Sequence, residues 1–152
     1  MFLKKFLNLI VIISLLFTFS FFSSCSSKPE ITEKFSGNLT GLVVGLPRPG
    51  GNGGLTEVRD TLSTDETNHA VRGFWNPVKN KYDAEFIWFD PEGKTAYTKT
   101  MNMSPDWKNT TIHYKGTGPL KAGTWTIAVK VDGKYLGKTE FSVVRDRSKI
   151  PL

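Results

Sequence analysis

Beyond Leu55, hydrophobic and polar positions alternate in short segments that are separated by clusters of Gly, Pro, Asn and Asp. β-branched and aromatic residues are frequent in these segments, which is typical of strands. No segment after residue 24 has the 3.6-residue apolar period of a convincing amphipathic helix. The pattern predicts strands over residues 57–63, 68–74, 84–89, 95–101, 110–114, 124–131 and 135–144.

The clearest alternation lies in residues 124–131. One face of this segment carries Trp125, Ile127, Val129 and Val131, and the other carries Thr124, Thr126, Ala128 and Lys130. This alternation predicts a strand with one face packed in the core and the other exposed to solvent. Asp132-Gly133 then predicts a two-residue type I′ hairpin turn, and Gly137 predicts a bulge in the returning strand. A second hairpin turn is expected at Pro91-Glu92-Gly93.

The pattern is less decisive before Leu55. Residues 38–46 form a short apolar segment compatible with a strand, and whether they join the same sheet stays open at this point. Residues 47–54 are almost all Gly and Pro, so no regular element is expected to cross them. This glycine-rich stretch has neither the Gly-Lys-Ser/Thr ending nor the following helix of a phosphate-binding loop, which favours a flexible loop.

An apolar run occupies the start of the chain. Lys4 and Lys5 precede 17 mostly apolar residues, 6–22, and the small residues Ser23 and Ser24 follow. As a helix the run would reach roughly 25 Å, which is short for a bilayer core of about 30 Å. The order of charged, apolar and small residues therefore predicts a secretory signal peptide over residues 1–24.

Phe22-Ser23-Ser24-Cys25 resembles the bacterial lipobox, although that pattern usually has Leu where Phe22 stands. The resemblance implies cleavage between Ser24 and Cys25, with palmitate-type acyl chains that anchor Cys25 to a membrane. The serine at position 26 would favour the outer membrane under the sorting rule of enterobacterial lipoproteins. Two alternatives remain: a thiol in an uncleaved anchor, or an ordinary signal peptide cut elsewhere among the serines.

About seven short strands at regular spacing predict an all-β fold, a single antiparallel sandwich. Residues 120–129, Asp132-Gly133 and Phe141-Ser142-Val143 are similar to the closing hairpin of bacterial immunoglobulin-like and fibronectin-like domains. Residues 84–94 resemble the central strand and turn of that fold. The resemblance implies that Trp88 and Trp125 fill the core, and it implies no catalytic residue.

Four regions are expected. They are a signal peptide (1–24), a lipidated Cys25 with a tether and a Gly/Pro-rich loop (25–54), a sandwich (55–146) and a C-terminal tail (147–152). The chain has 20 Lys and Arg against 14 Asp and Glu, and because the signal contains only Lys4 and Lys5, 18 against 14 leaves +4. The charges are interspersed, which argues against a nucleic-acid partner but is compatible with weak attraction to anionic headgroups. The only cysteine is Cys25, so an intramolecular disulfide is excluded.

Candidate chemistry is sparse. His69 and His113 match no local metal-ligand pattern, so we interpret both as partly exposed strand residues and expect neither a metal site nor a cofactor. Asp60, Asp65 and Glu66 are compatible with weak Ca²⁺ binding, but they lack EF-hand spacing, which favours a solvated turn. No Gly-x-Ser-x-Gly elbow occurs. The sequons at Asn38, Asn102 and Asn109 are interpreted as coincidental beside a bacterial signal.

Trp75 precedes Asn76-Pro77 and Trp107 follows Pro105-Asp106, so both are expected in loops. Together with Tyr82 they are the candidate binding residues, for a protein or a glycan of the envelope; the alternative is that both tryptophans cap the core. The sequence therefore predicts a non-enzymatic envelope lipoprotein that binds or buttresses another envelope component. The alternative is a carbohydrate-handling or hydrolytic accessory enzyme, which a deep pocket with two carboxylates, or with His69 beside His113, would favour.

Overall fold

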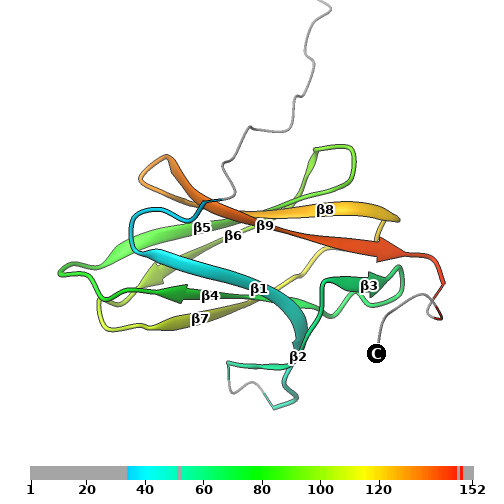
Figure 1. Ribbon diagram of the computed structural model, residues 1–152, viewed down its shortest axis with the longest axis horizontal. Helices are drawn as coiled ribbons and strands as arrows, with labels where there is room; N and C mark the ends of the chain where they lie inside the picture. Colours follow the sequence, from blue (N-terminus) through cyan, green and yellow to red (C-terminus); the bar gives the residue numbers. More distant parts are fainter. Residues whose placement is uncertain (1–33, 51–52, 147, 149–152) are drawn as a thin grey trace, which may run out of the picture.

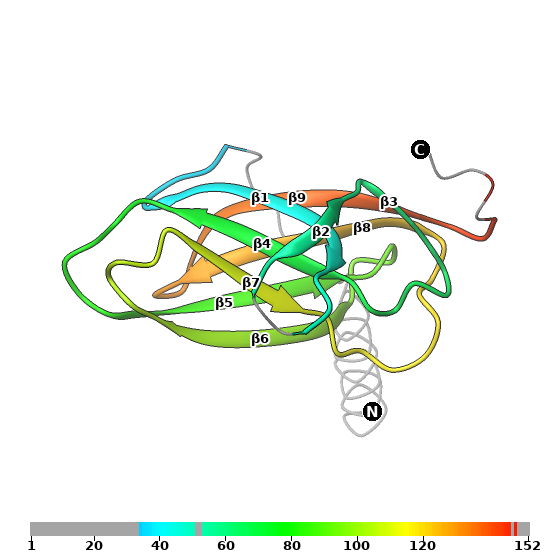
Figure 2. The same cartoon turned by 90° about the horizontal axis from the view of Figure 1, so that it is seen from below.

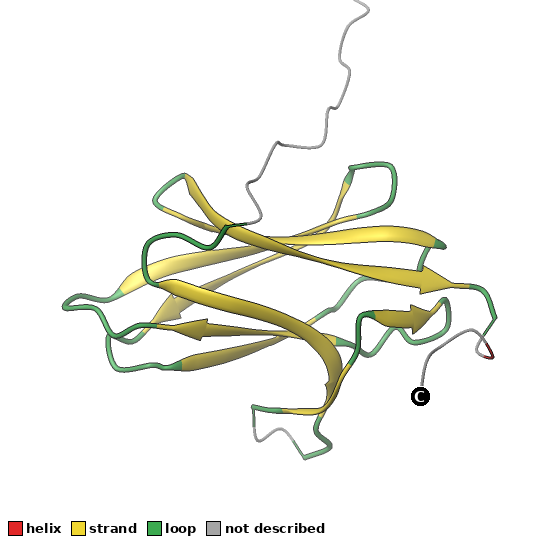
Figure 3. Cartoon of the chain, viewed as in Figure 1, coloured by secondary structure: helices red, strands yellow, loops and turns green. Residues whose placement is uncertain are grey.

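The computed structural model describes residues 34–50, 53–146 and 148. These residues form two β-sheets that pack face to face, as the two layers in Figure 1 show. Strands joined by loops make up the domain, and no α-helix occurs in the part of the chain described (Figure 3). The signal peptide and Cys25, which the sequence predicts, lie outside the described residues.

The first sheet has four strands in the order β2-β1-β4-β7, and the second has five in the order β3-β9-β8-β5-β6. All pairs are antiparallel except β3 with β9, which run parallel. The strands are β1 (Leu39–Pro47), β2 (Leu55–Val58), β3 (Thr61–Ser63), β4 (Ala70–Trp75), β5 (Tyr82–Phe89), β6 (Thr95–Met103), β7 (Asn109–His113), β8 (Gly123–Val131) and β9 (Lys134–Val144).

The connectivity identifies the fold. If the short strands β2 and β3 are set aside, the first, second and fifth remaining strands form one sheet, and the third, fourth, sixth and seventh form the other. This is the arrangement of immunoglobulin-like and fibronectin-like sandwiches, and Trp88 is fully buried on the strand where immunoglobulin domains carry their core tryptophan. The chain therefore folds as an immunoglobulin-like β-sandwich.

The sandwich begins before the predicted boundary at Leu55, because β1 belongs to it. Leu39, Leu42 and Val44 are buried in the main core, so residues 39–47 are not part of a tether. A bulge between Leu39 and Gly41 lets these apolar residues face inward although they do not alternate strictly. The Gly/Pro-rich stretch is consequently the connection between β1 and β2.

The predicted strand over residues 57–63 is divided between the two sheets. The Arg59 N–H donates to the Val44 carbonyl in the first sheet at 2.9 Å, whereas the Asp60 carbonyl accepts from the Ser142 N–H in the second at 2.7 Å. The chain thus crosses from one layer to the other at Arg59-Asp60, giving β2 and β3 where one strand was expected. The other six predicted strands occur, with ends shifted by at most a few residues.

The hairpin between β8 and β9 confirms most of the local predictions. Asp132 and Gly133 have φ of 49° and 77°, as a type I′ turn requires, and the register shifts beside Gly137. Trp125, Ile127 and Val129 are buried as expected. The prediction that the opposite face of β8 is exposed to solvent is wrong in part. Ala128 packs with Ile87, Phe89 and Tyr135 in a second, smaller cluster on the outer side of this sheet.

Candidate functional site

One end of the sandwich gathers the loops that the sequence singles out. The β4–β5 loop, the β6–β7 loop and the β8–β9 turn meet there, on the left in Figure 1, and the described chain enters at the same end. Val78 N–H donates to the Pro105 carbonyl at 3.2 Å, and Asn76 N–H donates to the Asn38 carbonyl at 2.8 Å. These backbone hydrogen bonds tie the loops to one another and to the start of β1.

The three candidate binding residues have different environments at this loop end. Trp75 is only 4% exposed and packs on Tyr82 and Phe86, with ring centroids 5.9 and 6.2 Å away. It caps the core, so the hypothesis that it belongs to an exposed aromatic patch is wrong. Trp107 is 41% exposed and stays a candidate contact residue.

Tyr82 lies between these extremes, since it is partly buried in the wall of a surface hollow of about 410 Å³. Its hydroxyl accepts a hydrogen bond from Asn38 Nδ2 at 2.7 Å. Burial raises the pKa of the Tyr82 phenol, and the bond from Asn38 offsets part of that rise. The other residues that line the hollow are mostly polar or charged: Asn38, Val78, Lys79, Asn80, Lys81, Val131 and Asp132.

A second depression lies along the side of the sandwich, between β6 and β7. It is an open groove of about 490 Å³. Each of these strands is the last of its sheet, and Figure 2 shows both on the same side of the domain. Its lining combines aromatic and apolar side chains with cations: Asn68, Tyr97, Lys99, Met101, Thr111, Ile112, His113, Tyr114 and Lys115.

A third hollow, of about 310 Å³, contains the two carboxylates Asp60 and Glu140. Asp60 accepts a hydrogen bond from the Thr61 hydroxyl at 3.2 Å. Glu140 lies 3.1 Å from the Lys138 ammonium and 3.4 Å from the Thr126 hydroxyl, from which it accepts. Both carboxylates therefore make contacts that hold neighbouring residues, and the hollow is open to solvent rather than deep.

His69 is fully buried, which corrects the interpretation that it is partly exposed. Its ring stacks on Tyr114 with centroids 4.6 Å apart, and it touches Phe141 at 5.3 Å. Burial lowers its pKa to about 4, so the ring is neutral at pH 7. His113 pairs with Ala70 on the neighbouring strand and lines the side groove, so the two histidines do not form a joint site.

The predicted acidic loop is occupied by internal contacts. Glu66 accepts hydrogen bonds from Arg59 at 2.9 Å and from the Ser63 N–H at 2.8 Å, and Asp65 accepts one from the Ser63 hydroxyl. Among the residues whose placement is described, no group of three or more His, Cys, Asp or Glu side chains is arranged to hold a metal ion. The carboxylates of this loop thus fix the turn between β3 and β4.

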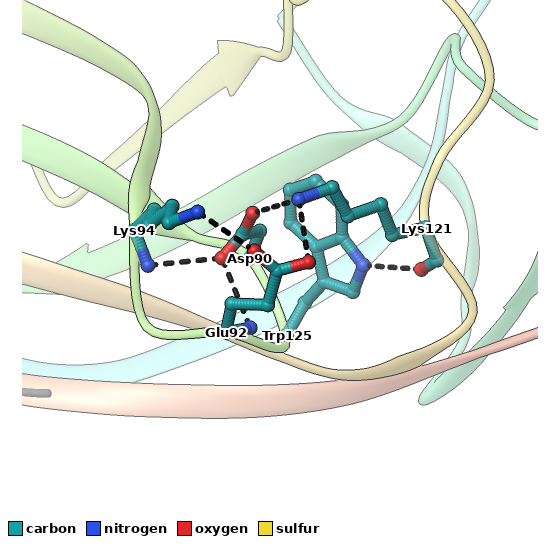
Figure 4. A network of polar contacts seen from close by, with 5 residues as sticks. All are labelled: Asp90, Glu92, Lys94, Lys121 and Trp125. Carbon is teal, nitrogen blue, oxygen red and sulfur yellow. Dashed lines mark hydrogen bonds and ion pairs between the residues drawn. The ribbon is translucent and has the colours of Figure 1, made fainter.

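A network of polar contacts joins the β5–β6 turn to the loop before β8 (Figure 4). Asp90 accepts from the N–H groups of Glu92 and Lys94 at 3.0 and 2.9 Å, and Lys121 Nζ donates to Asp90 at 2.7 Å and to Glu92 at 2.9 Å. Trp125 donates its indole N–H to the Lys121 carbonyl at 2.8 Å. Every member supports a turn or anchors the tryptophan, so the network is structural.

No protein-family model matches this chain, and no curated protein sequence matches it. An immunoglobulin-like protein from Pseudomonas aeruginosa, solved as a crystal structure, is similar to it with a TM-score of 0.47 and 12% sequence identity. The likeness covers 78% of this chain and 99% of the other. The assignment of the fold rests on the connectivity of the strands.

The side groove is not among the sites that the sequence pattern predicts. Three alternate residues of β6 line the groove: Tyr97, Lys99 and Met101. Their spacing is visible in the sequence, but it indicates a groove only together with the positions of β6 and β7 at the edges of their sheets.

Proposed function

We propose that this protein is a lipid-anchored component of a bacterial cell envelope, held by acylated Cys25, whose immunoglobulin-like domain is a non-enzymatic binding or buttressing module. The proposed export and lipid anchoring are supported by the order of Lys4, Lys5, the apolar run and the small residues before Cys25. The sandwich supports the proposed binding or buttressing role, because immunoglobulin-like folds commonly present binding surfaces on a rigid scaffold. Ser26 favours the outer membrane as the site of anchoring.

The observation that carries the proposal is the short distance along the chain between the predicted lipid and the domain. Residues 26–35 separate Cys25 from Ser36, whose backbone is hydrogen-bonded to the domain. Even fully extended, this stretch would reach about 40 Å. Ser36 N–H donates to the Leu136 carbonyl at 2.7 Å, so the domain entry is fixed at the loop end. An anchor at Cys25 would therefore hold the loop end near the membrane.

The charge and the exposed aromatic residue of the loop end agree with such an orientation. Lys79, Lys81 and Lys134 are exposed there, together with Trp107. Lysines near a membrane surface are attracted to anionic headgroups, and tryptophan favours the interface between water and lipid. The long sides of the sandwich would then stay accessible to a partner in the envelope.

The hydrolytic alternative has one observation in its favour, the hollow that contains Asp60 and Glu140. Glu140 is held by Lys138 and Thr126, and the hollow is shallow, whereas glycoside hydrolysis needs two carboxylates placed on either side of a bound sugar. The geometry therefore supports the binding module better than the enzyme.

The proposal is tested by expressing the full chain and its Cys25→Ala variant in a diderm bacterium that is fed an alkyne-labelled fatty acid. The unaltered chain should carry the label and fractionate with the outer membrane. The variant should lose the label, because the thiol that accepts the lipid is absent. Equal labelling of the two proteins, or an unlabelled wild-type chain in the soluble fraction, would contradict the proposal.

A further inference from the structure

The side groove lies where two sheet edges face each other. β6 has nine residues, and only its β5 side is paired; β7 has five residues, and only its β4 side is paired. Across the described part of the chain, no strand pairs with the free sides of β6 and β7. Each free edge presents unpaired backbone N–H and C=O groups, which another extended chain can use as a template.

Alternate residues of β6 face the groove. Tyr97, Lys99 and Met101 pair in register with Trp88, Phe86 and Ala84 of β5, all three of which are buried in the main core. Residues directly opposite each other in a sheet share a face, so these three side chains point to the inner side of the sandwich. Tyr97 and Met101 pack against the core, whereas Lys99 stays exposed because β6 is the last strand.

The charges around the groove have one sign. Lys99 and Lys115 line it beside His113, and no Asp or Glu does. Neither lysine forms an ion pair with any residue of the described ranges. A lysine at an inward position of an edge strand also hinders pairing between two copies of the chain, because the two ammonium groups would meet.

From the free edge, the inward alternation and the unpaired lysine, we infer that β6 binds an extended segment of a partner protein, which adds to the sheet as a further strand. The partner segment carries the pattern apolar-x-acidic-x-apolar. Its apolar side chains lie beside Tyr97 and Met101, and its carboxylate lies beside Lys99. Backbone pairing supplies affinity, and the three alternate side chains supply selectivity. This inference rests on the binding role proposed above and names the class of partner.

The test uses the full chain purified from membranes in detergent and a synthetic peptide, Thr-Thr-Val-Thr-Glu-Thr-Val-Thr-Thr, capped at both ends. A second peptide has Lys in place of Glu. Amide chemical-shift changes should map to β6 and to the facing residues of β7, and the acidic peptide should bind more tightly. Lys99→Glu should reverse that preference, changing the affinity ratio roughly tenfold or more, since opposite and like charges across strands differ by about 1–2 kcal/mol.

Lys79→Glu is the matched control, since it makes the same charge change on an exposed loop at the end of the domain. It should leave the preference for the acidic peptide in place. Two further copies of the acidic peptide, each N-methylated on one alternating set of residues, test the pairing itself. Only one set donates to β6, so one copy should lose binding and the other should keep it.

Equal affinity of the two peptides, chemical shifts confined to other strands, or equal effects of Lys99→Glu and Lys79→Glu would overturn the inference. Binding that survives both N-methylations would overturn the strand-addition geometry. Acylation of Cys25 is measured on the same preparation by its mass. Peptide binding to an unacylated protein would refute the anchor alone, whereas an acylated protein that ignores the peptide would refute this inference alone.

Discussion

Lys121, in the loop before β8, places its ammonium 2.7 Å from the carboxylate of Asp90, the residue that follows β5. The contact joins two loops that are 31 residues apart in the chain. The Asp90 side chain is 7% exposed, so this ion pair is better shielded from water than the others around it. It holds the β5–β6 turn against the segment that positions Trp125.

The buried carboxylate of Asp90 should contribute measurably to the stability of the domain. Asp90→Asn should lower the free energy of unfolding by about 1–2 kcal/mol, because it removes a buried charge-assisted acceptor. Glu92→Gln is the control and should have a much smaller effect, since Glu92 is half exposed. Urea denaturation of both variants at pH 7 measures the difference. Similar losses in the two variants would mean that the buried ion pair does not stabilise the turn.

Acid should weaken the same contact. Burial pushes the pKa of Asp90 upward, but the hydrogen bonds from Lys121 and from the Lys94 N–H outweigh it, and the pKa is lowered. The stabilisation from Asp90 is therefore fully present above the ordinary carboxyl pKa and is lost as the pH falls below about 4. The Asp90→Asn variant should therefore lose less of its free energy of unfolding than the unaltered chain as the pH falls below about 4.

His69 predicts a separate loss of stability at milder pH. Its pKa is about 4 in the folded chain and near 6.5 when unfolded, so protonation favours the unfolded state. The stabilisation from the neutral ring is present above pH 6.5 and is lost as the pH falls toward 4, by about 2 kcal/mol between pH 7 and pH 5. Denaturant titrations at both pH values should show this loss, and His69→Phe, which keeps a ring beside Tyr114, should remove most of it. An unchanged pH dependence in the variant would refute the role of His69.

Two glycines of β1 give a matched pair for the packing of that strand. A Cβ atom on Gly45 would lie 1.9 Å from the Glu57 carbonyl oxygen, whereas on Gly41 it would meet only the Phe74 ring, at 3.5 Å. Gly45→Ala should therefore destabilise the domain by at least about 2 kcal/mol, and Gly41→Ala should be close to neutral. Thermal unfolding of the two variants tests whether residues 39–47 belong to the sandwich, since equal effects would argue against the described packing of β1 on β2.

The proposed orientation predicts that one tryptophan lies in contact with the lipid of the membrane. Trp75, Trp88 and Trp125 are buried, and Trp107 is exposed at the loop end. In anionic bilayers, brominated lipids should quench part of the fluorescence of the acylated chain. Trp107→Phe should remove that quenching, while Trp125→Phe should preserve it. Quenching that persists in Trp107→Phe would place the loop end away from the lipid.

The local pattern was sufficient to predict the strands that alternate cleanly. Residues 124–131 carry a β-type alternation followed by a turn dipeptide, and both signals depend on neighbours in the chain. By contrast, β1 contains two glycines and a bulge, so its inward side chains do not alternate and the local pattern does not predict its place in the sheet. The crossing at Arg59-Asp60 depends on partners far along the chain, Val44 and Ser142.

The candidate site was less predictable for a related reason. In the sequence Trp75 is followed by Asn76-Pro77, which predicts a loop, whereas in the structure it ends β4 and packs on Tyr82 and Phe86. Lys99 looks like an ordinary solvated lysine in the sequence. Its significance follows from the position of β6 at the edge of the sheet and from the absence of acids around the groove, which the fold alone determines.

The most direct test of the central claim is the intact mass of the chain extracted from membranes. Cleavage before Cys25 followed by acylation predicts the mass of residues 25–152 plus a diacylglyceryl group, with or without a third acyl chain on the new amino terminus. A fragmentation spectrum should place the added mass on Cys25. An unmodified Cys25 thiol, a retained residue 1–24 segment or a cut elsewhere among the serines would contradict the account.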